Sequence, residues 1–194
     1  MNNQSLMIAL VTDTNDPDNL GRIQITLPAL PDGPALWARV VLPLAGSDRG
    51  LCLLPETGDE VLVAFSQAEL SSAYVLGGLW GKQKPPPEGL GGDQNDLKIF
   101  RTRSGHTLTF DDRQDKEQIV LTDKNDNSLV IATAEDSVTI TAKSKLEILT
   151  DGDLKLSGNT ITLQAGTMEL KADSSLTLDG GGKADLKAGT VNIN

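Results

Sequence analysis

The residues that could support acid–base, nucleophilic or metal chemistry are few in this chain and far apart. Its 194 residues include one histidine, His106, and one cysteine, Cys52. A thiol nucleophile needs a base within hydrogen-bond reach, and nothing in the spacing brings these two residues together. We predict instead that Cys52, inside the apolar run Leu51–Leu54, is a small buried hydrophobic residue. A single cysteine also excludes an internal disulfide.

Three further groups invite a chemical interpretation, namely Asp111/Asp112, Asp151/Asp153 and Gly180-Gly181-Gly182. Paired carboxylates can act in acid–base catalysis or bind calcium. Both pairs stand at turns between strand-like segments, where aspartate commonly bonds to its own backbone. The glycines lack the Lys-Ser/Thr and the helix that complete a phosphate loop. We therefore predict no catalytic residue, no metal site and no cofactor, and a protein that is not an enzyme.

The C-terminal part repeats one unit from about residue 127 onward: an apolar doublet, in which two apolar residues flank one other residue, and then a short polar stretch. The first members of successive doublets are 7, 8 or 9 residues apart. A period near eight with alternating polarity predicts strands joined by turns. The doublets are Leu129/Ile131, Val138/Ile140, Leu146/Ile148, Leu154/Leu156, Ile161/Leu163, Met168/Leu170, Leu176/Leu178, Ala184/Leu186 and Val191/Ile193.

Such a repeat must stack on itself or on copies of itself, because no aromatic residue follows Phe110 to build a larger core. The period fits neither a hexapeptide β-helix nor heptads, and the calcium-binding nonapeptide pattern fails at Ala184. Three chains wound into a triangular prism do fit, since each unit then advances the rod by about 4.8 Å. We predict that the doublets, Ala184 apart, form the core of a homotrimer. A single-chain β-solenoid is the alternative.

The N-terminal half contains short strand-like runs separated by turn signals such as Pro31-Asp32-Gly33-Pro34. Several short strands at this spacing predict a small closed β-barrel, either an OB-fold or an SH3-like barrel. Further strands are expected at Lys98–Thr102, His106–Asp111 and Gln118–Thr122. The candidate barrel strands are Leu6–Val11, Arg22–Leu27, Leu36–Leu42, Gly50–Leu54, Glu60–Phe65 and Ala73–Leu79.

Composition divides the chain into four predicted parts, all of them β-structure or linker. Residues 1–81 form the barrel, and the Pro- and Gly-rich residues 82–97 form a linker. The first strands of a shaft follow over 98–126, and the octad repeat occupies 127–194. The predicted fold class is therefore all-β, a barrel followed by a rod.

The chain carries a net charge of −10, which argues against nucleic acid as a partner because an acidic surface repels phosphate. The N-terminus lacks the basic start and apolar stretch of a secretory signal, and no apolar run reaches the length of a membrane span. We expect a protein made in the cytoplasm without a signal peptide.

Three phrases occur in order along the N-terminal half: DP-x-x-x-GR from Asp16 to Arg22, WARV over Trp37–Val40, and LPE-x-GDEV over Leu54–Val61. With their surroundings, which extend to Trp80, they resemble the OB-fold module of contractile-tail spike proteins. These are the phage baseplate assembly protein V family and the valine–glycine-repeat spike of type VI secretion. The segment Arg101–Asp123 is similar to the start of the spike shaft in the secretion family.

The resemblance implies a homotrimeric needle, an OB-fold barrel followed by a triple-stranded intertwined β-helix. It would attach to a separate hub protein at the end of the tail tube and pierce the target membrane when a sheath contracts. Because no hub module precedes the barrel and no lysozyme-like domain is inserted, the needle itself would not cleave peptidoglycan. The resemblance places the protein in the baseplate of a phage virion or of another contractile injection particle, including bacteriocins.

The shaft end departs from those phage relatives that bind iron through a His-x-His tip, because the chain has no histidine there. The apolar end of the prism would otherwise be exposed. We therefore expect a small cap protein of the PAAR type in contact with Val191, Ile193 and Asn194.

Three rival functions come from other classes. A trimeric adhesin or tail-fibre stem would need a distal binding head, and none follows the repeat. A monomeric β-solenoid enzyme acting on polysaccharide would need a cleft of acids and aromatics, but aromatics are absent from the repeat. An OB-fold binder of single-stranded nucleic acid would need basic grooves and stacking aromatics, against a net charge of −7 (5 basic and 12 acidic side chains) over residues 1–97.

Overall fold

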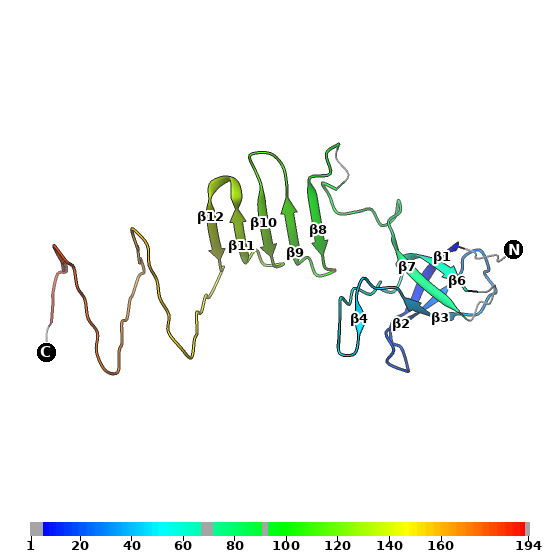
Figure 1. The fold of residues 1–194 in the computed structure, drawn as a ribbon, viewed down its shortest axis with the longest axis horizontal. Coiled ribbons are helices and arrows are strands. Elements are labelled where there is room, and N and C mark those ends of the chain that lie inside the picture. Colours follow the sequence, from blue (N-terminus) through cyan, green and yellow to red (C-terminus); the bar gives the residue numbers. More distant parts are fainter. Residues whose placement is uncertain (1–5, 67–71, 91–92, 193–194) are drawn as a thin grey trace. The chain divides into compact units, whose positions relative to one another are not determined.

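Five strands of the N-terminal part close into a barrel in the order β1-β2-β3-β7-β6 (Figure 1). The computed structural model describes residues 6–66, 72–90 and 93–192. Strands β3 and β7 run parallel, and the other neighbours in the barrel are antiparallel. This Greek-key order is that of the OB-fold and decides between the two barrels left open by the sequence. The barrel strands are β1 (Leu6–Asp13), β2 (Arg22–Thr26), β3 (Leu36–Val40), β6 (Glu60–Phe65) and β7 (Ala73–Leu79).

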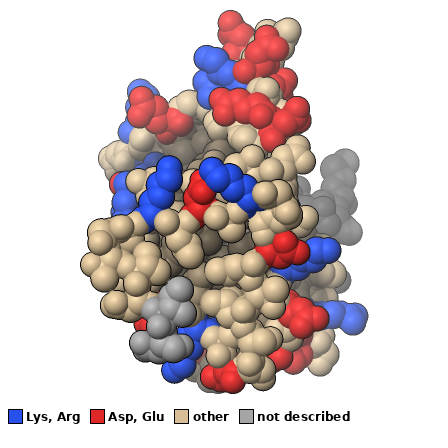
Figure 2. All heavy atoms as spheres, turned by 90° about the vertical axis from the view of Figure 1, so that its left-hand side faces the viewer, with Lys and Arg blue, Asp and Glu red and all other residues tan. Residues whose placement is uncertain are grey.

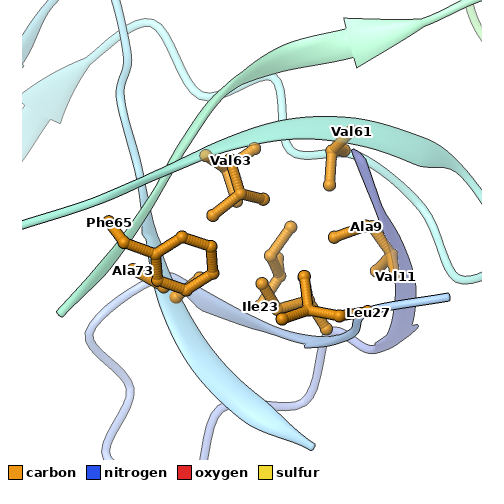
Figure 3. Packing of buried hydrophobic residues seen from close by; sticks show 11 residues of the cluster. Ala9, Val11, Ile23, Leu27, Val61, Val63, Phe65 and Ala73 are labelled. Carbon is orange, nitrogen blue, oxygen red and sulfur yellow. The ribbon is translucent and has the colours of Figure 1, made fainter. Parts of the chain in front are cut away.

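The barrel interior is filled by small aliphatic side chains, with Phe65 as the one aromatic among the described core residues (Figure 3). The period-two alternation read in the sequence places Val61, Val63 and Phe65 inside, as it does Ile23 and Ile25. Each core strand therefore has one face in a dry interior. The buried cluster consists of Ala9, Val11, Ile23, Ile25, Leu27, Ala38, Val61, Val63, Phe65, Ala73 and Val75.

Residues 41–54, which we call the hairpin arm, leave the barrel between β3 and β6. They contain only the two-residue strands β4 (Ala45–Gly46) and β5 (Arg49–Gly50). The predicted strand Gly50–Leu54 is therefore wrong beyond its first residue, and so is the predicted burial of Cys52, which is exposed. The physical reason is that β3 pairs directly with β7, so the barrel closes without this run and offers it no partner.

The β1–β2 loop is held together by the carboxylate of Asp16. Its oxygens accept hydrogen bonds from the backbone N–H groups of Asp18, Leu20 and Arg22, at 2.9–3.1 Å. The Arg22 guanidinium donates from Nε and Nη2 to the same carboxylate, with Nη2 at 2.6 Å from Oδ1. Gly21 has a φ of 70°, in the left-handed region that glycine adopts freely. In the DP-x-x-x-GR motif, the aspartate and the arginine thus bind each other and hold the β1–β2 loop closed.

A second sheet of five antiparallel strands follows in simple meander order, β8-β9-β10-β11-β12. Each of its four turns contains one residue with positive φ, which is Gly105, Asp115, Asp126 or Asp136. In each turn a backbone bond spans three residues, as from Gly105 N–H to the Thr102 carbonyl. A short 3-10 turn, η1 (Thr133–Glu135), forms the last of them. The strands are β8 (Leu97–Arg101), β9 (Thr107–Asp111), β10 (Gln118–Thr122), β11 (Ser128–Ala132) and β12 (Ser137–Thr141).

From residue 142 onward the chain changes character. The described residues 142–192 form no paired strand, and Figure 1 draws them as extended segments joined by bends. Among these residues only Gly181 has a positive φ. Residues of the kind that form the tight turns of the second sheet are therefore almost absent here. By their contacts the residues separate into two compact units, 1–145 and 146–194. The octad repeat spans both, because β11 and β12 hold its first two doublets.

The Asp16 carboxylate is expected to stabilise the barrel in a pH-dependent way. Hydrogen bonds from Arg22 hold its pKa below the ordinary value, so its contribution is complete above about pH 4 and is lost as the pH falls through the folded-state pKa. We expect Asp16→Asn to lower the thermal midpoint at neutral pH and to flatten its fall below about pH 4. Tryptophan fluorescence reports the transition, since Trp37 lies in β3.

Asp18→Asn is the matched control for that change. Asp18 is exposed and contacts Arg22 through a single guanidinium nitrogen at 2.5 Å, so its removal should change the midpoint little. Equal acid dependence of the Asp16→Asn variant and the unmodified protein would contradict the assignment.

Candidate functional site

One face of the second sheet is almost entirely apolar. The cross-strand register aligns Phe100 with Leu108, Leu121, Leu129 and Ile140, and it aligns Lys98 with Phe110, Ile119, Ile131 and Val138. Residues opposite each other in a sheet share a face, so nine apolar side chains from these two rows lie together. Lys98 is the one polar member. We call the nine side chains the apolar sheet face.

Nothing in the described part of the chain covers this face. Val138 is 67% exposed, Ile140 60% and Leu121 51%, and both phenylalanines are also exposed. Monomeric soluble proteins rarely expose a contiguous apolar surface of this extent. The face therefore has the character of an interface.

The opposite face of the same sheet suits water better. Its outer row carries Arg101, Thr107, Thr122, Ser128 and Thr141, which the register places side by side. The central row combines Thr109 and Thr139 with three aliphatic residues, Ile99, Val120 and Val130, that are half-buried in a single chain. Threonine has high β propensity and a hydroxyl that water can satisfy. The two faces of this sheet are thus chemically distinct.

Sequence reasoning identified four members of the apolar sheet face, Leu129, Ile131, Val138 and Ile140. It missed five, namely Phe100, Leu108, Phe110, Ile119 and Leu121. The signal was present, since Leu108/Phe110 and Ile119/Leu121 are doublets of the same kind. Their first members are 11 and 10 residues from the next doublet, so the longer turns concealed the period.

The remaining doublets, over residues 146–192, do not form a core within one chain. Their predicted core residues are exposed, from 49% at Met168 to 78% at Leu186, where a core position requires burial. The physical reason is that the described residues 142–192 have no paired strand, so no second layer of the same chain lies over them. The exposed core candidates are Leu146, Ile148, Leu154, Leu156, Ile161, Leu163, Met168, Leu170, Leu176, Leu178, Leu186 and Val191.

This exposure corrects any assignment of these side chains to a core made by a single chain, and their place in a trimer core stays a prediction. From Glu147 onward the residue between the two members of a doublet is always polar, as Lys155 and Thr162 are. Each unit thus has one apolar and one polar side, and within residues 146–192 none has a partner strand in the described part of its own chain. Ile193 and Asn194 lie outside the described residues.

The point where the chain leaves the second sheet is fixed by a small polar network. The Asp123 carboxylate accepts bonds from the backbone and the side-chain amide of Asn127, at 2.9 and 2.7 Å. These bonds lower the pKa of Asp123. The Asn127 carbonyl oxygen Oδ1 then accepts the backbone N–H of Lys143 at 2.8 Å. The β10–β11 turn thereby anchors the first residues after β12.

The carboxylate pair Asp111/Asp112 is held in ion pairs. Asp111 is buried and accepts from Arg113 Nε at 2.8 Å and from Arg113 Nη2, and these bonds lower its pKa to about 2. Asp112 pairs with Lys98 at 3.1 Å. A carboxyl that acts as a general acid needs a raised pKa. The pKa of Asp111 is lowered instead, so this group is not suited to that role. The exposed Asp151 and Asp153 flank a bend at Gly152, whose N–H donates to Thr150 Oγ1 at 3.1 Å.

The other candidate chemical residues occupy turns and loops. His106 closes the β8–β9 turn, where its N–H donates to Thr102 Oγ1 at 3.1 Å. Within the described ranges, no group of three or more His, Cys, Asp or Glu residues is placed to hold a metal ion. Figure 2 shows acidic and basic side chains close to one another on the visible surface, without a continuous basic area.

Two arginine–aromatic contacts lie on the outside of the barrel. Arg22 stands over the Trp37 ring at 5.7 Å and Arg39 over the Tyr74 ring at 5.9 Å. The four side chains line a hollow of about 480 Å³. Arg22 is already neutralised by Asp16 and Asp18, so its role is structural.

The chain thus combines a five-stranded OB barrel with a second sheet whose apolar face is uncovered. The family described as the type VI secretion system/phage-baseplate injector OB domain matches residues 7–80. The type VI secretion system spike protein VgrG3 of Vibrio cholerae serotype O1 is 27% identical over 114 residues, which are 54% of this chain and 11% of that protein. Residues 7–80 therefore match the injector OB domain of type VI secretion systems and phage baseplates, and the resemblance drawn from the sequence is confirmed.

The aligned part of this chain spans only 11% of the length of that relative. Among the residues that the structure describes, none forms a helix with the length and hydropathy of a membrane span.

A matched pair of substitutions on β12 tests whether the apolar sheet face is an interface. Ile140 and Thr139 are adjacent and both exposed in a single chain, but they lie on opposite faces. A carboxylate at either position would be hydrated in a monomer. We expect Ile140→Asp to abolish self-association, because an unpaired buried charge costs several kcal/mol, on the order of 3–5.

Thr139→Asp should leave association unchanged. Mass measured by light scattering during gel filtration distinguishes the variants. If both assemble like the unmodified chain, the face is open to solvent and the interpretation fails.

Proposed function

We propose that this chain is the central spike of a contractile injection system. In this role it acts as a homotrimer in which an OB barrel is followed by a triple-stranded intertwined β-helix. The barrel attaches to a separate hub protein at the tube end, and the shaft points toward the target envelope. The family of residues 7–80 supports the injection-system setting, and the relative VgrG3 is itself described as a spike protein.

The observation that carries the proposal is the state of the octad repeat in one chain. Its described residues 146–192 carry strand-spaced apolar doublets whose large side chains are at least 49% exposed, and these residues have no strand partner. Extended backbone needs hydrogen-bond partners on its edges. A copy of the same chain supplies partners with the same period along the whole length, which an unrelated partner does not.

Three copies fit the period. About eight residues make one side of a triangular prism, so a chain returns to the same side after three units, or about 24 residues. Strands from the other two chains fill the space between. The apolar doublets then point to a common axis, and the polar middle residues point to water. In the proposed assembly the apolar sheet face over β8–β12 would also meet its copies in the other two chains.

The mechanism that follows is mechanical. The sheath supplies the work, and the spike needs stiffness and a narrow, wettable profile. Hydrogen bonds between three chains must break together along the shaft, so stiffness follows from the topology. The proposal assigns no catalytic step and no cofactor to this chain. It places the protein in a phage baseplate or a related injection particle.

The rival functions receive less support. In a monomeric β-solenoid, successive coils pair within one chain, yet the described residues 142–192 contain no such pairing. A trimeric adhesin or tail-fibre stem shares the three-chain shaft, but its family would not be that of an injector OB domain.

Mass and stability of the assembly test the proposal. A trimer of three 20.6 kDa chains has a mass near 62 kDa, and we expect it to survive detergent, because its chains are interwoven. Leu156→Asp should prevent assembly, since three carboxylates would meet near one axis without hydration. Lys155→Asp, one residue away on the polar side, should assemble normally. A monomeric unmodified protein would rule out the spike.

The tip is expected to bind a small PAAR-type cap protein. A chain truncated after Gly189 loses Val191, the last described doublet residue, together with Ile193 and Asn194. We expect the truncated trimer to keep its mass and to lose the cap in a pull-down. Unchanged cap binding would place the cap site elsewhere.

A further inference from the structure

The hairpin arm has apolar side chains that no described part of its own chain covers. Val41, Leu44, Leu51 and Leu53 are each 47–57% exposed. The arm is a two-stranded hairpin, closed by the pairs Ala45–Gly50 and Gly46–Arg49, and such a hairpin is only marginally stable in water. An apolar arm of this kind needs a surface to lie on.

The barrel also carries a second uncovered apolar surface, on β1, β6 and β7. Because Ala9 and Val11 fill the core, the alternate residues Leu6, Ile8 and Leu10 point outward, and they are 61%, 52% and 37% exposed. Across the strands, Ile8 faces Leu62, while Leu10 and Leu79 flank Glu60. We call the outward side chains of these strands the apolar wall. It consists of Leu6, Ile8, Leu10, Leu62, Leu76 and Leu79.

The wall is shaped for close contact with another polypeptide. Gly77, opposite Leu62, has open space where a Cβ would be, with no heavy atom within 4 Å. The wall is therefore flat at its centre and lets a backbone approach closely. Strand β1 is apolar on both faces, a pattern typical of strands that are buried on both sides.

A threefold ring explains why one barrel carries two such surfaces. In a cyclic trimer the contact is heterologous, so each chain must offer two different complementary patches, one to each neighbour. We propose that the hairpin arm of each chain packs on the apolar wall of the next chain's barrel. This inference rests on the homotrimer of the proposed function and adds a barrel collar that the shaft does not require.

Charge and position favour a second copy as the occupant. Arg49 at the arm tip forms no ion pair with a carboxylate of the described residues, while Glu60 is exposed within the wall. The base of the arm, at Cys52 and Leu53, lines the same hollow as Phe100 of the apolar sheet face. The arm is thus continuous with the surface that joins the shaft chains.

The lone cysteine makes the inference testable in the full-length protein. Cys52 lies on the arm and is exposed. Ile8→Cys adds one thiol on the wall, so each chain can link to both of its neighbours. After treatment with a short bismaleimide, we expect a covalent trimer on a denaturing gel, at least about tenfold more than in controls, because the thiols are held at high effective concentration.

Two controls measure the crosslinking that occurs without an arm–wall contact. A further variant tests whether a negative result comes from a local disturbance at position 8. Asp32→Cys places the added thiol in an exposed turn outside the wall. Ile8→Cys combined with Cys52→Ser removes the arm thiol. Leu79→Cys repeats the test from another strand of the wall, and the yield should not change on dilution.

The native mass, measured before treatment, separates the two proposals. A trimer that gives no more covalent product from both wall variants than from Asp32→Cys overturns the collar and leaves the spike standing. Covalent dimers of the unmodified chain, linked Cys52 to Cys52, would show that the arms meet each other and would also overturn it. A monomer overturns the collar and the spike together.

Discussion

An extended strand must have its backbone hydrogen bonds satisfied and its apolar side covered, and the described part of this chain meets that requirement in one region and leaves it unmet in another. Over residues 97–141 it supplies its own neighbours, since every turn of the second sheet contains a residue that adopts a left-handed conformation. Beyond residue 141 such residues nearly disappear, and the strands no longer return on themselves. The same doublet therefore makes a hairpin sheet before this point, whereas after it the described doublets stay exposed and would pack on other chains in the proposed trimer.

The barrel could be predicted closely from the sequence because its signals are local. Alternation in Glu60–Phe65 and Arg22–Leu27 fixes strand and inward face together. The choice of the OB-fold over the SH3-like barrel depended on the parallel pairing of β3 with β7, which joins Arg39 to Tyr74 across a long stretch of chain. No local pattern encodes that contact.

The failures at Cys52 and in the second sheet have a common physical origin. An apolar run such as Leu51–Leu54 indicates that a segment is covered from water. It does not indicate whether the same chain or another chain covers it. The missed doublets, such as Ile119/Leu121, differ only in the length of the turns between them, and turn length carries no information about the face on which a side chain lies. The Asp16–Arg22 loop was recognised only as a phrase, and its geometry gives that phrase a structural reason.

The order of the two sheets along the chain also bears on how three copies would meet in the proposed trimer. The barrel has a dry core of its own, and the second sheet is formed within one chain, so both are ordered before association. Ordering a free segment costs roughly 1–2 kcal/mol per residue in backbone entropy, which the repeat can recover only when partner strands are present. Three preformed apolar sheet faces offer a first contact at which little entropy remains to be lost. Once three faces were joined in the proposed trimer, the following repeats would be held at high effective concentration, so the shaft would extend most favourably from the Asn127–Lys143 anchor toward the C-terminus.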